Sequence, residues 1–538
     1  MKNKILISSL ALCVFTALSG CADSSKAESS ASPVPPVVHN PNAAIVEGIV
    51  SADAMLFPAD VQIKGKNGKQ VTTTTDVYGH FSADVSGLSA PLVLAAKEKG
   101  AQCSDESQQM GICLASVTLS APKAGNSQTV NLNPLTDYIT SQIAAHSGFA
   151  GPEQLSQAVD TQKVTQNRYQ LALQNFDTAF GKAVGQLGLP KDFNPIDYAS
   201  GWQGKVDRLN ALIWENRGYQ SSKGLPSQVM MLNKAFEPIG DKDLSGNTIA
   251  VDAVKIEQKL TQIQNAKTRV FIVGDSTASI YTHQQFPRMG WGQVFQQHFD
   301  PKNVQVVDGA QSGRSSRLYR NQGWFRYLAS MMRPGDYLFI EMGHNDEKCD
   351  AAKAGRGAVD VANLCTYPNT AEGKEQYPKG HPEMSFANSL EFYVNYARAH
   401  QMTPVLLTPT TRFKNAHGRK ETPVVHSHYT KSSSKHDYAF VGDYSQTIKD
   451  TAQKNSVPLL DVEAGTIAQA NKIGNANWKK YWLAVDPQKY PYYSNRTGRV
   501  DKPDTTHFQQ RGAQMVASVV AGAIKQNSHL SELAQYLN

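Results

Sequence analysis

The C-terminal half of this 538-residue sequence predicts an α/β fold, and the N-terminal half predicts a small all-β sandwich followed by a helical segment. Three observations support this division. From residue 267 onward, continuous apolar runs alternate with stretches of helical period, which is typical of a parallel sheet covered by helices on both faces. Residues 45–133 instead contain short β-type runs separated by turn residues. Between residues 134 and 265, the apolar period becomes that of a helix.

Residues 1–20 have the pattern of a secretory signal, because the basic start M-K-N-K is followed by an apolar run and then by small residues. The stretch L-S-G-C at residues 18–21 resembles a bacterial lipobox, which implies that Cys21 becomes the lipid-carrying first residue of the mature protein. Simple cleavage and secretion is the alternative. Ala22 favours the outer membrane, by resemblance to sorted lipoproteins. We therefore expect a protein of the bacterial cell envelope, anchored through Cys21 and facing the periplasm or the surface.

The next segments have distinct compositions. Residues 21–44 are rich in Ser, Ala and Pro and predict a tether without a core. Within the β-rich segment 45–133, the stretch T-T-T-D-V-Y-G-H-F resembles the hairpin of carboxypeptidase-regulatory-like and related immunoglobulin-like modules. That resemblance implies a spacer or, as the alternative, a glycan-binding module.

Residues 134–265 predict helices that pack on a neighbouring part of the chain. The apolar residues follow one another at steps of three and four, which lines one helix face. They are Leu173, Phe176, Phe180, Val184 and Leu187, and then Val206, Leu209, Leu212 and Ile213. We interpret these side chains as core rather than as a cofactor site.

The α/β segment, residues 267–527, contains five apolar runs that we expect to be parallel strands, at 269–273, 304–307, 337–342, 404–408 and 457–462. Candidate helices lie between them, for example at residues 291–299 and 389–400. In such a sheet, sites form at the carboxyl ends of the strands. The stretch G-D-S at 274–276 lies at the end of the first run.

A nucleophilic serine needs a base, a group that orients the base, and donors for the oxyanion. Ser276 is the candidate nucleophile, and His507 is the candidate base, with Asp504 three residues before it. Gly313 follows the second run and Asn345 follows the third, so both can supply oxyanion donors. Each motif alone has an ordinary interpretation as a turn, a loop or a helix cap, and a metal pair at Asp504 and His507 lacks further ligands nearby.

Together, the four blocks resemble the SGNH (GDSL-type) hydrolase superfamily over residues 267–527. The resemblance implies a flavodoxin-like three-layer α/β/α domain and a catalytic triad of Ser276, Asp504 and His507. It also implies an oxyanion hole formed by the N–H groups of Ser276 and Gly313 with the Asn345 amide, without a metal or a cofactor. The glycine pattern of the α/β-hydrolase elbow, G-x-S-x-G, is not present at Ser276.

The stretches G-D-S-T-A-S, G-W-G-Q, D-G-A-Q-S-G-R-S-S-R, P-G-D-Y-L-F-I-E-M-G-H-N-D and D-T-T-H-F resemble the rhamnogalacturonan acetylesterase branch of that superfamily. This branch implies an esterase that removes acetyl groups from pectin or related polysaccharides. Two segments depart from the branch, the insertion between Cys349 and Cys365 and the polar loop at residues 426–436. The alternatives are a lipase, a thioesterase, a peptidoglycan O-acetyl esterase, or a non-catalytic glycan-binding lipoprotein of the envelope.

Cysteine use and charge agree with export. Four cysteines remain after Cys13 of the signal and Cys21, and in an oxidising compartment we expect the pairs Cys103–Cys113 and Cys349–Cys365. Zinc is the rival interpretation, but C-x-x-C spacing and a nearby histidine pair are both missing. The formal net charge of +7 is spread over a long chain, with no run of basic residues interleaved with aromatic ones. Nucleic acid is therefore not an expected partner.

Overall fold

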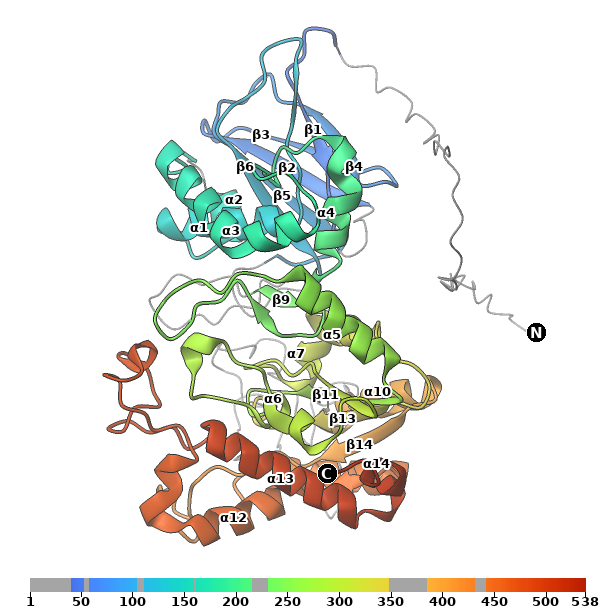
Figure 1. Ribbon diagram of the computed structural model, residues 1–538. Coiled ribbons are helices and arrows are strands. Elements are labelled where there is room, and N and C mark those ends of the chain that lie inside the picture. The colour runs from blue at the N-terminus through green and yellow to red at the C-terminus, as the bar shows by residue number, and fades with distance from the viewer. Residues whose placement is uncertain are drawn as a thin grey trace, which may run out of the picture. The chain divides into compact units, whose positions relative to one another are not determined.

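The five strands of the predicted parallel sheet are present in the computed structural model (Figure 1). The structure describes residues 40–52, 58–103, 111–158, 161–214, 231–347, 385–430 and 442–538. Cys21, the expected Cys349–Cys365 pair and residues 431–436 of the polar loop lie outside this part of the chain.

Residues 45–129 form two sheets. The strands are β1 (Ile45–Ile49), β2 (Ala59–Gly65), β3 (Gln70–Thr74), β4 (His80–Asp84), β5 (Leu92–Glu98), β6 (Cys113–Thr118) and β7 (Ser127–Thr129). Their orders are β4-β1-β7 and β3-β2-β5-β6, and only the β1–β7 pair is parallel. A disulfide joins Cys103 to Cys113 at the start of β6. The turn before β4 is held by Asp76, whose carboxylate accepts the N–H groups of Tyr78 and His80.

The following segment contains α1 (Pro134–His146), α2 (Pro152–Gln157), α3 (Gln166–Gln186), α4 (Gln203–Asn210) and α5 (Ala253–Asn265). Asn133 caps α1, because its side-chain oxygen accepts the N–H groups of Leu135 and Thr136. This segment is not wholly helical. The strands β8 (Ile213–Trp214), β9 (Met231–Asn233) and β10 (Pro238–Ile239) form a small antiparallel sheet.

The expected helical pattern that ends at Ile213 is therefore wrong at its end. The helix ends at Asn210, and Ile213 of β8 pairs with Asn233 of β9. A short, fully buried strand that follows a helix can continue the apolar spacing of three and four residues. The spacing alone therefore does not show where the helix ends.

The parallel sheet contains β11 (Thr268–Gly274), β12 (Val304–Asp308), β13 (Tyr337–Glu341), β14 (Thr403–Leu407) and β17 (Leu459–Leu460). All four strand pairs are parallel, and the order is β12-β11-β13-β14-β17. This is the flavodoxin-like order 2-1-3-4-5. The strands are buried almost throughout, as a sheet covered on both faces requires.

Alternate residues of each strand point into two separate cores, which makes the domain three-layered. Val270 and Phe339 pack with α6 (Trp291–Phe295), α12 (Val462–Asn477) and α13 (Gln510–Gln526). Phe271 and Leu338 pack on the other side, with α7 (Ser316–Asn321), α8 (Trp324–Ala329), α10 (Phe386–Ala399) and α11 (Tyr444–Asn455). In the described part of the chain, every helix is too short or too polar to cross a membrane.

The strand order also determines where the site forms. The chain runs from β11 outward to β12 and then returns across β11 to β13, so the carboxyl ends of these three strands are neighbours. The loops that follow them carry Ser276, Gly313 and Asn345. A crevice outside such strand ends is the usual ligand site of an open α/β sheet.

Candidate active site

Ser276 lies in the tight turn that follows β11, and 7% of its surface is exposed. The residues on either side hold this turn. Asp275 Oδ1 accepts the N–H and the hydroxyl of Thr277, each at 3.0 Å. The Asp275 carbonyl accepts the Ser279 hydroxyl at 2.7 Å, and the Tyr281 hydroxyl donates to the Ser276 carbonyl. The backbone on both sides of the serine is therefore fixed by hydrogen bonds.

The structure brings Ser276, His507 and Asp504 into one line of contacts. Ser276 Oγ lies 2.9 Å from His507 Nε2, and His507 Nδ1 lies 2.7 Å from Asp504 Oδ2. Asp504 Oδ1 also accepts the N–H groups of Thr506 at 2.8 Å and His507 at 3.2 Å. These distances allow a proton to pass from the hydroxyl to the imidazole.

Backbone hydrogen bonds hold the loop that carries the histidine and the aspartate. Asp504 N donates to the Leu483 carbonyl at 2.9 Å, and Leu483 N donates to the His507 carbonyl at 2.8 Å. Phe413 N donates to the Thr505 carbonyl at 2.9 Å, which ties the loop to the segment after β14. The loop position therefore depends on main-chain atoms from two distant segments.

The charge state of Asp504 suits an orienting role. Burial alone would raise the pKa of this carboxyl. The neighbouring His507, the Thr506 N–H and the Arg288 charge outweigh burial and bring the pKa well below its usual range. The ionised carboxylate accepts Nδ1–H, which leaves the Nε2 lone pair facing Ser276 Oγ. This is the tautomer that a general base requires.

The candidate oxyanion donors converge from the other two loops. Gly313 has a φ of +82°, which favours glycine at this turn. Within the described part of the chain, the N–H groups of Ser276 and Gly313 donate no hydrogen bond. Asn345 is buried, and its Nδ2 donates one hydrogen to the Arg314 carbonyl at 3.2 Å. That bond orients the amide toward the loop that carries Gly313.

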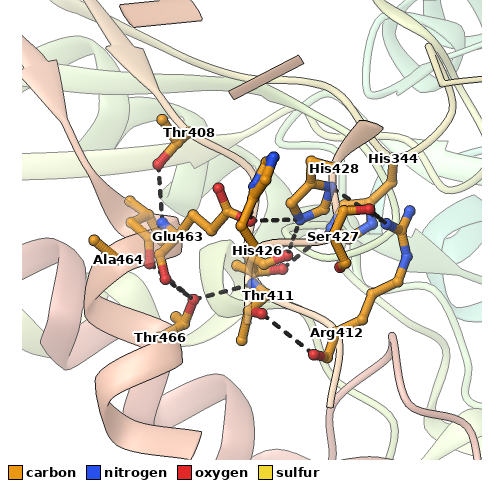
Figure 2. A network of polar contacts seen from close by, with 12 residues as sticks. His344, Thr408, Thr411, Arg412, His426, Ser427, His428, Glu463, Ala464 and Thr466 are labelled. Atoms are coloured by element: carbon orange, nitrogen blue, oxygen red, sulfur yellow. Dashed lines mark hydrogen bonds and ion pairs between the residues drawn. The ribbon is translucent and has the colours of Figure 1, made fainter. Parts of the chain in front are cut away.

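A charged network of Glu347, Arg412 and His428 anchors the loop that contains Asn345. Figure 2 shows Arg412 and His428 of this network beside His344. Glu347 accepts Arg412 Nη2 at 2.7 Å and contacts His428 Nδ1 at 2.5 Å. His428 is fully buried, and its Nε2 lies 2.8 Å from the Thr410 carbonyl. The segment after β13 is thereby tied to the segment after β14. The sequence alone did not predict this network, although the H-S-H pattern at residues 426–428 lies in the polar loop at residues 426–436.

His344, Glu347 and His428 form a group whose possible ligand atoms all lie within 4.8 Å of one another. His428 Nε2 lies against the Thr410 carbonyl, and its Nδ1 lies against both the Glu347 carboxylate and the Arg412 guanidinium. The Arg412 guanidinium already neutralises Glu347. A guanidinium beside Glu347 disfavours a second cation there, so the described contacts are those of a hydrogen-bonded ion network.

Burial also perturbs several titratable groups around the site. It raises the pKa of Asp275 to about 6 and that of Asp346 to about 7, against hydrogen bonds from Thr277 and Ser316 that lower them. Burial and the Asp275 charge raise the pKa of Glu341 well above its ordinary value. Burial, and then the neighbouring Arg412, His428 and His507, lower the pKa of His344 well below its ordinary value. Such shifts are frequent at functional sites.

Comparison with known proteins gives a family match for residues 272–515, to the GDSL-like lipase/acylhydrolase family. Rhamnogalacturonan acetylesterase RhgT of Bacillus subtilis (strain 168) is 28% identical over 259 residues, which are 48% of this chain and 90% of that protein. The probable rhamnogalacturonan acetylesterase YesY of the same strain is 28% identical over 260 residues, 48% of this chain and 92% of that protein.

Similar solved structures include a variant of an acetyl xylan esterase from Geobacillus stearothermophilus. It is 15% identical and covers 49% of this chain and 96% of that chain, with a TM-score of 0.28. So low a score supports no inference about substrate.

Proposed function

We propose that the protein is a serine-dependent acetylesterase that acts on a polysaccharide. Residues 272–515 form a GDSL-like lipase/acylhydrolase domain, which makes the protein a carboxylic ester hydrolase. The observation that carries this proposal is the contact series from Ser276 Oγ through the His507 ring to Asp504, at 2.9 and 2.7 Å. These atoms have the distances of a nucleophile, a general base and an orienting carboxylate.

In the proposed reaction, Ser276 Oγ attacks the acetyl carbonyl carbon while His507 Nε2 takes the hydroxyl proton. The ionised Asp504 stabilises the imidazolium that forms. The N–H groups of Ser276 and Gly313 and the Asn345 amide donate to the carbonyl oxygen as it becomes negative. His507 then gives its proton to the departing sugar oxygen, which leaves an acetyl group on Ser276.

Deacylation repeats these steps with water. His507 Nε2 takes a proton from the water molecule as it attacks the acetyl-enzyme carbonyl, and the same three donors hold the oxyanion. Collapse of this intermediate breaks the bond to Ser276 Oγ, which recovers its proton from His507, and the acetic acid that leaves ionises to acetate by giving a proton to the solvent. Every proton is returned, so the cycle consumes only the ester and one water molecule.

The similar proteins suggest the substrate. Two Bacillus subtilis relatives that align over almost their whole length are named rhamnogalacturonan acetylesterases, one of them as probable. We infer that the natural substrate of this chain is an acetylated polysaccharide of the rhamnogalacturonan or pectin type.

Acetate release tests both the chemistry and the substrate. Wild type and Ser276→Ala are incubated with acetylated rhamnogalacturonan, acetylated xylan, O-acetylated peptidoglycan and a long-chain ester. Ser518→Ala is the matched control, because Ser518 is an exposed serine of α13. We expect acetate from rhamnogalacturonan with wild type and the control, and none with Ser276→Ala. Serine-independent release would refute the mechanism, and release from peptidoglycan alone would refute the substrate.

We also propose that the protein is anchored in the bacterial envelope through a lipid on Cys21. The support is the lipobox-like L-S-G-C stretch after the secretory signal. Expression with radiolabelled palmitate should label the wild type and leave Cys21→Ser unlabelled. Equal labelling of the two proteins would refute the anchor.

A further inference from the structure

The two neighbours of Ser276 belong to a buried group of two carboxyls joined by one hydroxyl. Thr277 Oγ1 lies 3.0 Å from Asp275 Oδ1, and 3.0 and 3.1 Å from Glu341 Oε1 and Oε2. Asp275 and Glu341 are both fully buried. Glu341 is the last residue of β13, so this contact joins the nucleophile turn to the neighbouring strand.

Counting hydrogen atoms shows that this arrangement holds an additional proton. A threonine hydroxyl has one proton to donate and lone pairs that accept. If both carboxyls were ionised, only one could receive that proton, and the other would face an oxygen lone pair. Two such anions out of contact with water would also repel each other strongly. One of the two carboxyls is therefore protonated.

The surrounding donors indicate which one. Asp275 Oδ1 accepts the Thr277 N–H at 3.0 Å, and the neighbouring His428 and Arg412 favour the ionised form of Asp275. Among the described residues, the other donors to Glu341 lie farther away, Trp291 Nε1 at 3.4 Å and Thr410 N at 3.3 Å. Asp275 is thus the better-supported anion.

We propose that Glu341 holds this proton and acts as a positioning residue for Ser276. Its O–H donates to Thr277 Oγ1, and the Thr277 hydroxyl donates to Asp275 Oδ1. The resulting chain of two hydrogen bonds locks the turn that presents the nucleophile. This proposal deepens the proposed esterase function and rests on it for its kinetic consequences.

The neutral state of Glu341 also limits the negative charge near the oxyanion. Asp275 is the charged group that acts on Glu341 directly, while Asp346 and Tyr281 interact with Asp275. Loss of the Glu341 proton at alkaline pH would place a second buried anion beside Asp275 and remove the first hydrogen bond of the chain. The rate of acetyl transfer therefore falls as Glu341 ionises.

Glu341→Gln is the most direct test, because the amide keeps the shape and supplies an N–H in place of the O–H. Glu391→Gln is the matched control, since Glu391 pairs with Lys454 on α11, outside the site. Infrared spectroscopy at pH 8 should show a protonated-carboxyl band in wild type and Glu391→Gln that Glu341→Gln lacks. Thr277→Val should shift this band by removing its acceptor. A band that is unchanged in both folded variants overturns the proposal.

Kinetics with p-nitrophenyl acetate give a second readout. Glu341→Gln should keep kcat within about threefold of wild type at pH 7 and should lack the alkaline fall, because a neutral hydrogen bond replaces a neutral hydrogen bond. Thr277→Val should lower kcat roughly tenfold or more, since two carboxyls lose their shared partner. An alkaline fall that persists in Glu341→Gln overturns the proposal. If the wild type cleaves no ester, the proposed function fails, and the infrared comparison still decides where the proton is.

Discussion

The ion pair between Arg412 and Glu347 permits a quantitative test of how the Asn345 loop is held. The two side chains are 15% and 12% exposed, and Nη2 lies 2.7 Å from Oε2. Removing one partner of a fully buried pair costs about 3–5 kcal/mol. Here the partial exposure and the second partner of Glu347, His428, reduce the loss. A charged hydrogen bond of this kind contributes about 1.5–3 kcal/mol, so we expect Arg412→Met to lower the free energy of unfolding by roughly 2–3 kcal/mol.

A double-mutant cycle separates the pair from its surroundings. Urea unfolding of Arg412→Met, Glu347→Gln and the double variant should give a coupling free energy of about 1–2 kcal/mol, as for contacting residues of one network. Because Glu347 lies two residues after Asn345, each single variant should also lower kcat for p-nitrophenyl acetate by roughly tenfold to a hundredfold through misplacement of the amide. Additive effects on stability, or an unchanged kcat, would refute the view that this network positions the loop.

Three further predictions concern the proposed machinery and its surroundings. Asp504→Asn should lower kcat by roughly 10³–10⁴-fold with little change in fold, because a neutral amide no longer selects the Nδ1–H tautomer of His507. Stopped-assay kinetics measure kcat and circular dichroism measures the fold, and a loss of kcat below tenfold would contradict the prediction. Asn345→Ala should lower kcat by about 10²–10³-fold, measured on p-nitrophenyl acetate, and a near wild-type rate would remove the amide from the oxyanion hole. The third prediction concerns pH. Contacts with Asp443 and Glu463 raise the pKa of His426 to about 10. The contribution of His426 to the free energy of unfolding is therefore complete below the unfolded pKa of about 6.5, and it disappears as the pH rises through the folded value. His426→Gln should therefore flatten the decrease in unfolding free energy over that alkaline range, and an unchanged slope in urea titrations would argue against it.

The sequence predicted the parallel sheet and the residues at its strand ends because both leave local signals. A fully buried strand such as β11 needs an uninterrupted apolar run, and the G-D-S turn directly follows it. The contact of Ser276 with His507 spans 231 positions, but the motif order of a known family already implied it. The network of Glu347 with His428 spans 81 positions and has no such signal.

The remaining features depend on tertiary contacts. Glu341 looks like the polar end of a strand in the sequence, and its protonation follows only from Thr277 lying between it and Asp275. Likewise β8 is a two-residue strand, and its Ile213 also fits the helical period of Val206, Leu209 and Leu212. Where the same apolar spacing fits both a helix and a short strand, the residues that pack against the segment determine which of the two forms.

The way the His507 loop is held has a consequence for how such an enzyme changes substrate. Its anchors are main-chain atoms of Leu483, Phe413 and Thr505, and a main-chain bond survives replacement of the side chain beside it. Parts of the segments between these anchors, such as residues 414–425 and 484–503, can therefore vary in composition without loss of the main-chain bonds that hold the proposed base. In the proposed esterase, the position of the base thus depends on main-chain atoms, and the side chains of the same loops can change without displacing it.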